Sequence, residues 1–218
     1  KPGKGGILPA AKVTEEIARI RHIPVGEPSI SPNRHPEIDN VEELLDFIAR
    51  VRSVSKLPTG FKTVLGAYGW GDDLCDAIDR RGIESAPDFI TLDGGDGGTG
   101  AAPMSLMDNV GLPLKQALPM LSDILIRRGL RERIKIIASG KLVTPADVAW
   151  AYCAGADAVN TARGFMFSIG CIQAMRCNTN NCPTGVTTHK RHLQNGLDPK
   201  VKAKHVANYV EKMRKDVA

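Results

Sequence analysis

Four short apolar segments, each followed by a helical pattern, constrain the fold of this chain more than any other feature. They cover residues 61–65, 88–92, 134–138 and 158–161. Strands that alternate with helices predict a parallel sheet, because the connection between neighbouring parallel strands must cross over and usually contains a helix. We therefore expect these strands to be adjacent and parallel, in chain order. A fifth candidate strand lies near residues 29–31.

Capping residues and glycines mark the ends of the expected helices. Helices are expected to begin at or near Thr14, Asp39, Asp72, Pro113, Thr144, Gly164 and Asp198, and three of them to end at Gly82, Gly129 and Gly155. Asp39 with Glu42 resembles a capping box, in which two side chains satisfy the first free N–H groups of a helix. No linker is long enough to divide the chain, so we expect one domain.

Composition excludes several classes of protein. Apolar residues make up 42% of the 218 residues, and no uncharged apolar run reaches the roughly 20 residues that span a bilayer. The net charge is +5, but the basic residues are scattered and aromatics are only 5%, which argues against a nucleic-acid partner. No signal peptide is visible, so we expect a cytoplasmic protein without a membrane partner. Lys1 in place of Met indicates that the chain begins within a longer polypeptide.

Two closures of the parallel sheet are compatible with the length. A doubly wound sheet can be complete in 218 residues. A (β/α)₈ barrel needs eight strands and typically about 250 residues, so this chain would form its C-terminal part.

A glycine-rich segment, residues 93–100, follows the second strand. It contains the spacing G-x-G-x-x-G at Gly95, Gly97 and Gly100. A dinucleotide-binding motif needs a helix at once and an acidic residue about 20 positions later, but Pro103 interrupts and the next strand begins near residue 134. We favour a strand-end loop whose backbone approaches a flat or anionic ligand. A simple glycine-rich turn is the alternative.

The next two strand ends have a similar character. Ser139, Gly140 and Lys141 follow the third strand, and residues 161–164, with Arg163 and Gly164, follow the fourth. Barrels often bind phosphate with the loops after their last two strands, through backbone N–H groups and nearby cations. Either loop alone can be only a turn, but the pair on consecutive strands favours an anion site.

Lys62 interrupts an otherwise apolar strand. It can lie at the margin and extend its ammonium to water. Alternatively, it lies inside the barrel beside a ring that becomes anionic on reduction, as a flavin does. In that interpretation we expect Lys62 to point into the barrel with no carboxylate partner of its own.

Three of the five cysteines lie close together in the sequence. An odd number of cysteines without a secretion signal argues against a disulfide framework. Cys75 and Cys153 fall in helical patterns and are predicted to be core residues. Cys171, Cys177 and Cys182 have the spacing C-x5-C-x4-C, followed by Pro183, which favours an iron–sulfur cluster with three protein ligands. A zinc site with His189 as the fourth ligand, or three free thiols, are the alternatives.

Several motifs together resemble the FMN-binding barrel of glutamate synthase. They are KPGKGGILPAAKV at residues 1–13, IARIRH at residues 17–22, DGGTGAAP at residues 96–103 and the three-cysteine loop. The resemblance covers nearly the whole chain. It implies that residues 1–218 form the C-terminal part of a (β/α)₈ barrel, with about four or five parallel strands, an iron–sulfur loop at residues 171–183 and a C-terminal helix.

The resemblance also implies an activity. Members of this family carry FMN and a [3Fe-4S] cluster and convert 2-oxoglutarate to glutamate by reductive amination. Ammonia comes from an amidotransferase, and electrons pass through the cluster to FMN from ferredoxin or from an NADPH-oxidising partner. The implied catalytic and oxoacid residues are Lys1, Arg21 and Asp96; the implied FMN residues are Lys62, Gly97, Gly98, Ser139, Gly140, Lys141, Arg163 and Gly164; the implied cluster ligands are Cys171, Cys177 and Cys182.

One position departs from the family pattern. Ile7 stands where the large enzymes have a glutamine that contacts the oxoacid, and an apolar side chain cannot form that hydrogen bond. We therefore expect the substrate to be 2-oxoglutarate or a related oxoacid. Three alternatives stay open: an N-methylglutamate-synthase-like subunit, an electron-transfer or assembly subunit without oxoacid chemistry, and a half-barrel that pairs with a second copy as a homo-oligomer.

Overall fold

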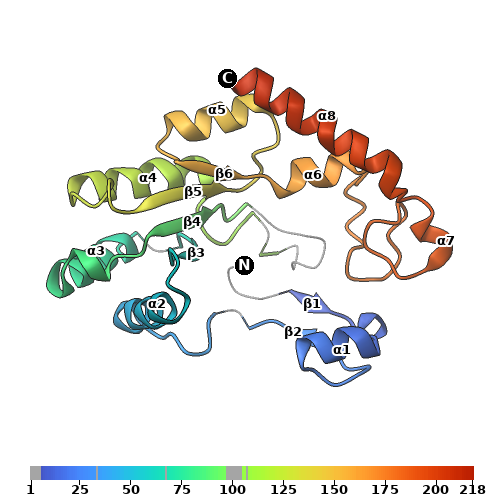
Figure 1. Ribbon diagram of the computed structural model, residues 1–218, viewed down its shortest axis with the longest axis horizontal. Coiled ribbons are helices and arrows are strands. Elements are labelled where there is room, and N and C mark those ends of the chain that lie inside the picture. The colour runs from blue at the N-terminus through green and yellow to red at the C-terminus, as the bar shows by residue number, and fades with distance from the viewer. Residues whose placement is uncertain (1–5, 33, 67, 97–104, 107) are drawn as a thin grey trace.

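The computed structural model describes residues 6–32, 34–66, 68–96, 105–106 and 108–218 (Figure 1). The strands are β1 (Ile7–Leu8), β2 (Ser29–Ile30), β3 (Phe61–Val64), β4 (Phe89–Asp93), β5 (Lys135–Ser139) and β6 (Ala158–Asn160). The helices are α1 (Glu15–Arg21), α2 (Val41–Ser55), α3 (Trp70–Arg81), α4 (Leu114–Arg127), α5 (Pro145–Cys153), α6 (Ala162–Ser168), α7 (Arg191–Gln194) and α8 (Pro199–Val217), with 3₁₀ turns at Ala10–Lys12 and Ile83–Ser85. No described helix combines the length and apolar character that crossing a membrane requires.

The main sheet confirms the predicted strand order. β3, β4, β5 and β6 are adjacent in chain order, and all three pairs are parallel. A helix follows each of these strands, so the described part of the chain is an α/β fold with four alternating units (Figure 1).

The fifth candidate strand is real but belongs elsewhere. β2 pairs antiparallel with β1, with Ile7 opposite Ile30, in a separate two-stranded sheet. The expectation that it adds to the parallel sheet is therefore wrong. Both strands have only two residues, which is too short to show the alternation that distinguishes sheet types in a sequence.

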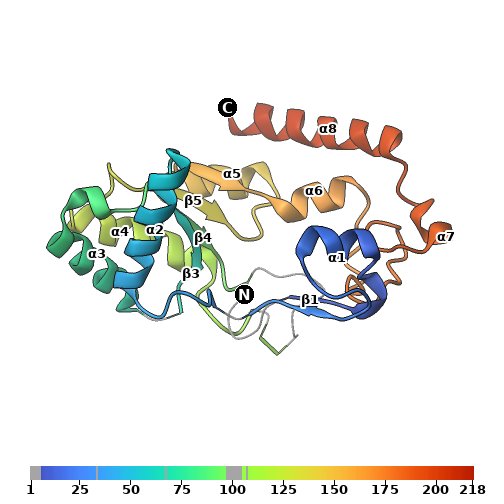
Figure 2. The same ribbon diagram turned by 60° about the horizontal axis from the view of Figure 1, so that its bottom comes forward.

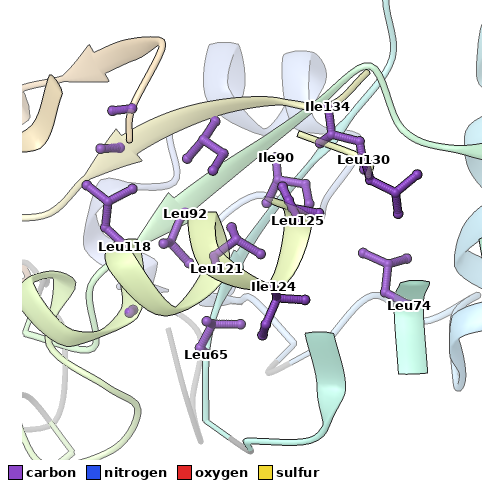
Figure 3. Close-up of a cluster of buried hydrophobic side chains, with 14 of the residues drawn as sticks. Leu65, Leu74, Ile90, Leu92, Leu118, Leu121, Ile124, Leu125, Leu130 and Ile134 are labelled. Carbon is purple, nitrogen blue, oxygen red and sulfur yellow. The ribbon is translucent and has the colours of Figure 1, made fainter. Parts of the chain in front are cut away.

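The register of the main sheet separates its two faces, because directly paired residues point to the same side. Ile90, Leu92, Ile136 and Ala138 lie on one face and have no exposed surface. Figure 3 shows Ile90 and Leu92 with the leucines and isoleucines of α4, and this face carries the hydrophobic core. The opposite side, which we call the open face, begins at Lys62, whose side chain is 59% exposed.

Some helices begin one or two residues away from the positions that the capping residues predict. Asn40, not Asp39, is the N-cap of α2, and its side chain accepts a hydrogen bond from the Glu43 N–H at 2.9 Å. The Glu43 carboxylate accepts from the Asp39 N–H at 2.7 Å and not from the N–H of the N-cap Asn40, so the expected capping box with Asp39 and Glu42 does not form. Helix α3 begins at Trp70, two residues before Asp72. Thr144 caps α5 as predicted, in a capping box with Asp147.

The predicted burial of the two helical cysteines is half right. Cys75 on α3 is fully buried, and this burial raises the pKa of its thiol. Cys153 is the last residue of α5 and is exposed. The helical sequence pattern around Cys153 suggested a buried position, but α5 ends at this residue and its side chain is exposed.

The C-terminal helix α8 packs against α5 and α6 (Figures 1 and 2). Its Tyr209 hydroxyl donates a hydrogen bond to the Val143 carbonyl at 2.9 Å. Gly164 on α6 is buried beneath this ring, and a Cβ there would lie 2.5 Å from Tyr209 Cζ. Glycine at position 164 therefore permits the close approach of α8.

Candidate functional site

A cavity of about 1010 Å³ lies at the carboxyl ends of β3 to β6, between these strand ends and the cysteine loop. Sites in parallel α/β folds form there because loops after different strands converge at one edge of the sheet. The residues predicted from sequence that line it are Lys62, Ser139, Gly140, Lys141, Arg163, Cys171, Cys177 and Cys182. The fold thus brings together side chains from four separate predicted motifs.

Lys62 lies on the open face, the side on which the flavin interpretation placed it. Its Nζ is 2.7 Å from Asp93 Oδ2, so the expectation of an ammonium without a carboxylate partner is wrong. Lys62 pairs with Thr91, and Asp93 lies two residues further along β4 on the same face. That spacing puts the carboxylate within reach of a lysine side chain.

The turn after β5 is fixed by the end of β4. The Ser139 carbonyl accepts a hydrogen bond from the Gly94 N–H at 2.8 Å. Gly140 has a φ of 138°, a conformation that side chains with a Cβ rarely adopt. The Lys141 ammonium pairs with Asp108 at 2.9 Å. The turn therefore presents backbone and a partly neutralised cation to the cavity.

Of the two predicted site residues in the turn after β6, one lines the cavity and the other does not. Arg163 is half-buried and lines the cavity. Gly164 is not among the lining residues, because it faces Tyr209 of α8. The structure gives Gly164 a packing role, and its contact with a ligand phosphate through the backbone stays a prediction.

Of the three predicted catalytic residues, the two that the structure describes, Arg21 and Asp96, do not line the cavity. The Asp96 carboxylate accepts a hydrogen bond from the Leu114 N–H at 3.3 Å, at the start of α4, and Asp96 does not line the cavity. Arg21 is the exposed last residue of α1 and is also not a lining residue. Lys1, Gly97 and Gly98 lie outside the described residues.

The three-cysteine loop forms one wall of the cavity. Cys171, Cys177 and Cys182 are each half-buried and line the same space. Within the described ranges, no three side chains of His, Cys, Asp or Glu converge on a single metal ion. His189, the fourth ligand of the zinc alternative, is exposed, and its backbone N–H donates to Asn180 Oδ1 at 2.7 Å. Thiols that share a cavity wall fit a multi-iron cluster, in which different iron atoms take different ligands.

Cys182 is the thiol with the strongest local donors. Burial opposes its ionisation, but the Thr184 hydroxyl and the backbone N–H groups of Thr187 and Thr184 outweigh burial and lower the pKa of the thiol to about 6. The distance from Cys182 Sγ to Thr184 Oγ1 is 3.5 Å. The lowered pKa favours the thiolate of Cys182 at neutral pH, and the thiolate is the form that binds metals.

One residue of the site was missed from the sequence. Lys12 is only 6% exposed, and its ammonium donates to the carbonyls of Cys177 at 2.8 Å and Thr187 at 2.5 Å. It links the segment after β1 to the cysteine loop. The only sign in the sequence is a lysine between Ala11 and Val13, and nothing there points to partners more than 160 residues away.

Comparison with known families decides the relationship. Residues 1–218 match the family described as "Conserved region in glutamate synthase". The chain belongs to the glutamate synthase family. This confirms the resemblance inferred from the sequence motifs, over the full length of the chain.

Individual relatives also belong to the glutamate synthase group by their names. The chain is 47% identical over 211 residues to the glutamate synthase large subunit-like protein YerD of Bacillus subtilis, covering 97% of this chain and 40% of the relative. It is 37% identical to an archaeal glutamate synthase [NADPH] of Methanocaldococcus jannaschii, covering 97% and 41%. It is 36% identical to the chloroplastic ferredoxin-dependent glutamate synthase of Oryza sativa, covering 89% and 12%. The chain thus spans about 40% of the length of the first two relatives.

The lowered pKa of Cys182 gives a pH-dependent result in cluster-free protein. We expect the rate of Cys182 alkylation by iodoacetamide to rise with pH and reach half its plateau near pH 6, because only the thiolate reacts. Mass spectrometry of the peptide that contains Cys182 measures the rate. Thr184→Val, which removes the hydroxyl donor, should move the midpoint upward. A midpoint near that of an ordinary cysteine, about pH 8.5, would contradict the assignment.

Proposed function

We propose that this protein is a flavin- and iron–sulfur-dependent oxidoreductase of the glutamate synthase type, which reductively aminates 2-oxoglutarate or a related oxoacid. One observation carries the proposal: Lys62, the turns after β5 and β6, and all three loop cysteines line a single cavity. Membership of the glutamate synthase family supports it independently.

The proposed fold of the whole domain is a (β/α)₈ barrel, of which this chain supplies the C-terminal part. Parallel strands in chain order, each followed by a helix, are the repeating unit of that barrel. The open face of the sheet would then be the barrel interior. The cavity at the carboxyl ends of the strands is where barrel enzymes hold their ligands.

FMN would be held by residues on two sides of the cavity. Gly140 presents its backbone, while Lys141 and Arg163 contribute positive charge on the phosphate side. The pair of Lys62 and Asp93 would face the ring. The cluster would be held by Cys171, Cys177 and Cys182. When bound, the two groups supply hydride transfer and one-electron transfer.

The experiment uses the full-length protein purified without oxygen. We expect acid extraction to release FMN, and chemical analysis to find iron and labile sulfide in a ratio near 3:4. Addition of 2-oxoglutarate with ammonia should reoxidise the reduced flavin. Stoichiometric zinc without labile sulfide would show that the zinc alternative is right. Flavin and cluster without reoxidation by any oxoacid would favour an electron-transfer subunit.

Ile7 favours a second candidate, in which the amine donor or oxoacid differs. Its apolar side chain lies in β1 opposite Ile30 and offers no hydrogen bond to a substrate. A subunit of the N-methylglutamate-synthase type would use methylamine. Competition between methylamine and ammonia in the reoxidation assay separates the two. An amidotransferase, an electron-donor subunit or ferredoxin, a homo-oligomeric state and a cytoplasmic location stay predictions.

The pair of Lys62 and Asp93 should influence the flavin potential in opposite directions. Two-electron reduction leaves negative charge on the ring, so Lys62→Met should lower the midpoint potential by about 30 mV, which corresponds to about 1.4 kcal/mol. Asp93→Asn should raise it by a similar amount, and the double variant should lie near the wild type. A dye-equilibrated reductive titration of the full-length protein measures each value. Shifts in the same direction for both single variants would exclude this role.

A further inference from the structure

The ammonium of Lys12 is a buried cation without an anionic partner. It donates to two carbonyls, and no carboxylate forms an ion pair with it in the described part of the chain, which contains all 24 acidic residues of the sequence. A buried charge without a counter-charge is costly, and neutral carbonyls offset only part of that cost. The position therefore suits a negative group that the amino acids do not provide.

Both carbonyls that hold Lys12 belong to the cysteine loop. One is the carbonyl of Cys177 itself, and the other is that of Thr187, five residues after Cys182 in the same loop. The segment that carries Lys12 lies beside this loop (Figure 2). The ammonium of Lys12 is thus held by the backbone of one predicted cluster ligand, Cys177, and by the loop backbone that follows another, Cys182.

An iron–sulfur cluster held by three thiolates is such a negative group. Its net charge becomes one unit more negative when it accepts an electron, so a nearby fixed cation stabilises the reduced state more than the oxidised state. Exposed cations near the loop have a weaker effect, because water and salt screen them. Lys190, for example, is exposed and donates to Asn181 Oδ1 at 2.6 Å.

We propose that Lys12 is the internal counter-charge of the cluster: it positions the cysteine loop and raises the reduction potential of the cluster. The proposal rests on the proposed function, since it requires a cluster on Cys171, Cys177 and Cys182. It assigns to Lys12 a positioning role and no contact with the substrate.

Three variants of the full-length protein test the charge. Lys12→Met keeps the apolar stem, Lys12→Gln keeps a neutral donor, and Lys12→Arg keeps the charge. Redox titration of the cluster, followed by electron paramagnetic resonance, measures the potential. At the wild-type midpoint we expect the ratio of reduced to oxidised cluster to fall about tenfold in the first two variants, which is about 59 mV for one electron. Lys12→Arg and the control Lys190→Met should stay near the wild type.

Thermal unfolding provides a second measurement that does not depend on the potential. Lys12→Met should lower the Tm more in cluster-loaded protein than in cluster-free protein, because the charge has its partner only in the former. Equal losses in both forms would show a purely structural clamp and overturn the proposal, as would a full cluster at the wild-type potential in Lys12→Met. If Lys12→Met does not fold, Lys12→Gln decides by the same criteria. Wild-type protein without labile sulfide would overturn the proposed function itself, a different outcome from an intact cluster with unchanged potential.

Discussion

Replacing Cys177 by serine in the full-length protein should abolish the proposed iron–sulfur cluster. With three protein ligands, each thiolate holds its own iron atom, and a serine oxygen is a poor substitute for sulfur. We expect labile sulfide to fall to background in Cys177→Ser, and equally in Cys171→Ser and Cys182→Ser. Colorimetric iron and sulfide analysis of anaerobic preparations measures the loss.

Cys153 provides the matched control for this series. It is exposed at the end of α5 and does not line the cavity, so Cys153→Ser should retain full iron and sulfide. A complete cluster in any one of the three loop variants would remove that cysteine from the ligand set. Loss of sulfide in Cys153→Ser would show that the assay reports general damage.

Replacing Leu118 by alanine should have the largest effect on stability. Leu118 on α4 has no exposed surface and packs in the core on the helix side of the sheet (Figure 3). Leucine-to-alanine changes in such cores cost about 2 to 5 kcal/mol, because the transfer free energy is lost and a cavity remains. Chemical denaturation followed by circular dichroism measures the free energy of unfolding.

Ile126 on the same helix is the matched control. Its side chain is 60% exposed, so Ile126→Ala should change the free energy of unfolding by about 0.5 kcal/mol or less. Similar costs for Leu118→Ala and Ile126→Ala would mean that the core does not lie between α4 and the sheet.

The four strands of the parallel sheet could be predicted from the sequence because the signals that mark each strand lie within a few residues of it. Each of the four parallel strands is an apolar run next to a capping residue or a glycine, and such signals extend over only a few positions. The turn at Ser139, Gly140 and Lys141 could be placed at the cavity for the same reason. Parallel strands end at one edge, so knowing the strands fixes which loops meet.

Other features could not be predicted because they depend on contacts between distant residues. Lys12 is explained only by the carbonyls of Cys177 and Thr187, 165 and 175 residues away. The carboxylate partner of Lys62 follows from the register between β3 and β4, which no single strand encodes. The packing of Tyr209 against Gly164, 45 residues earlier in the chain, likewise has no local signal in the sequence.

The separation of the two sheet faces has a consequence for changing the specificity of this domain. Substitutions at Val64 and Asn160, which line the cavity, would alter its wall without touching the residues that stabilise the fold. Leu92 on β4 and Ala138 on β5, which point to the opposite face, have no exposed surface and tolerate little change. A combinatorial library restricted to alternate strand positions could therefore vary the cavity wall while most of its members still fold.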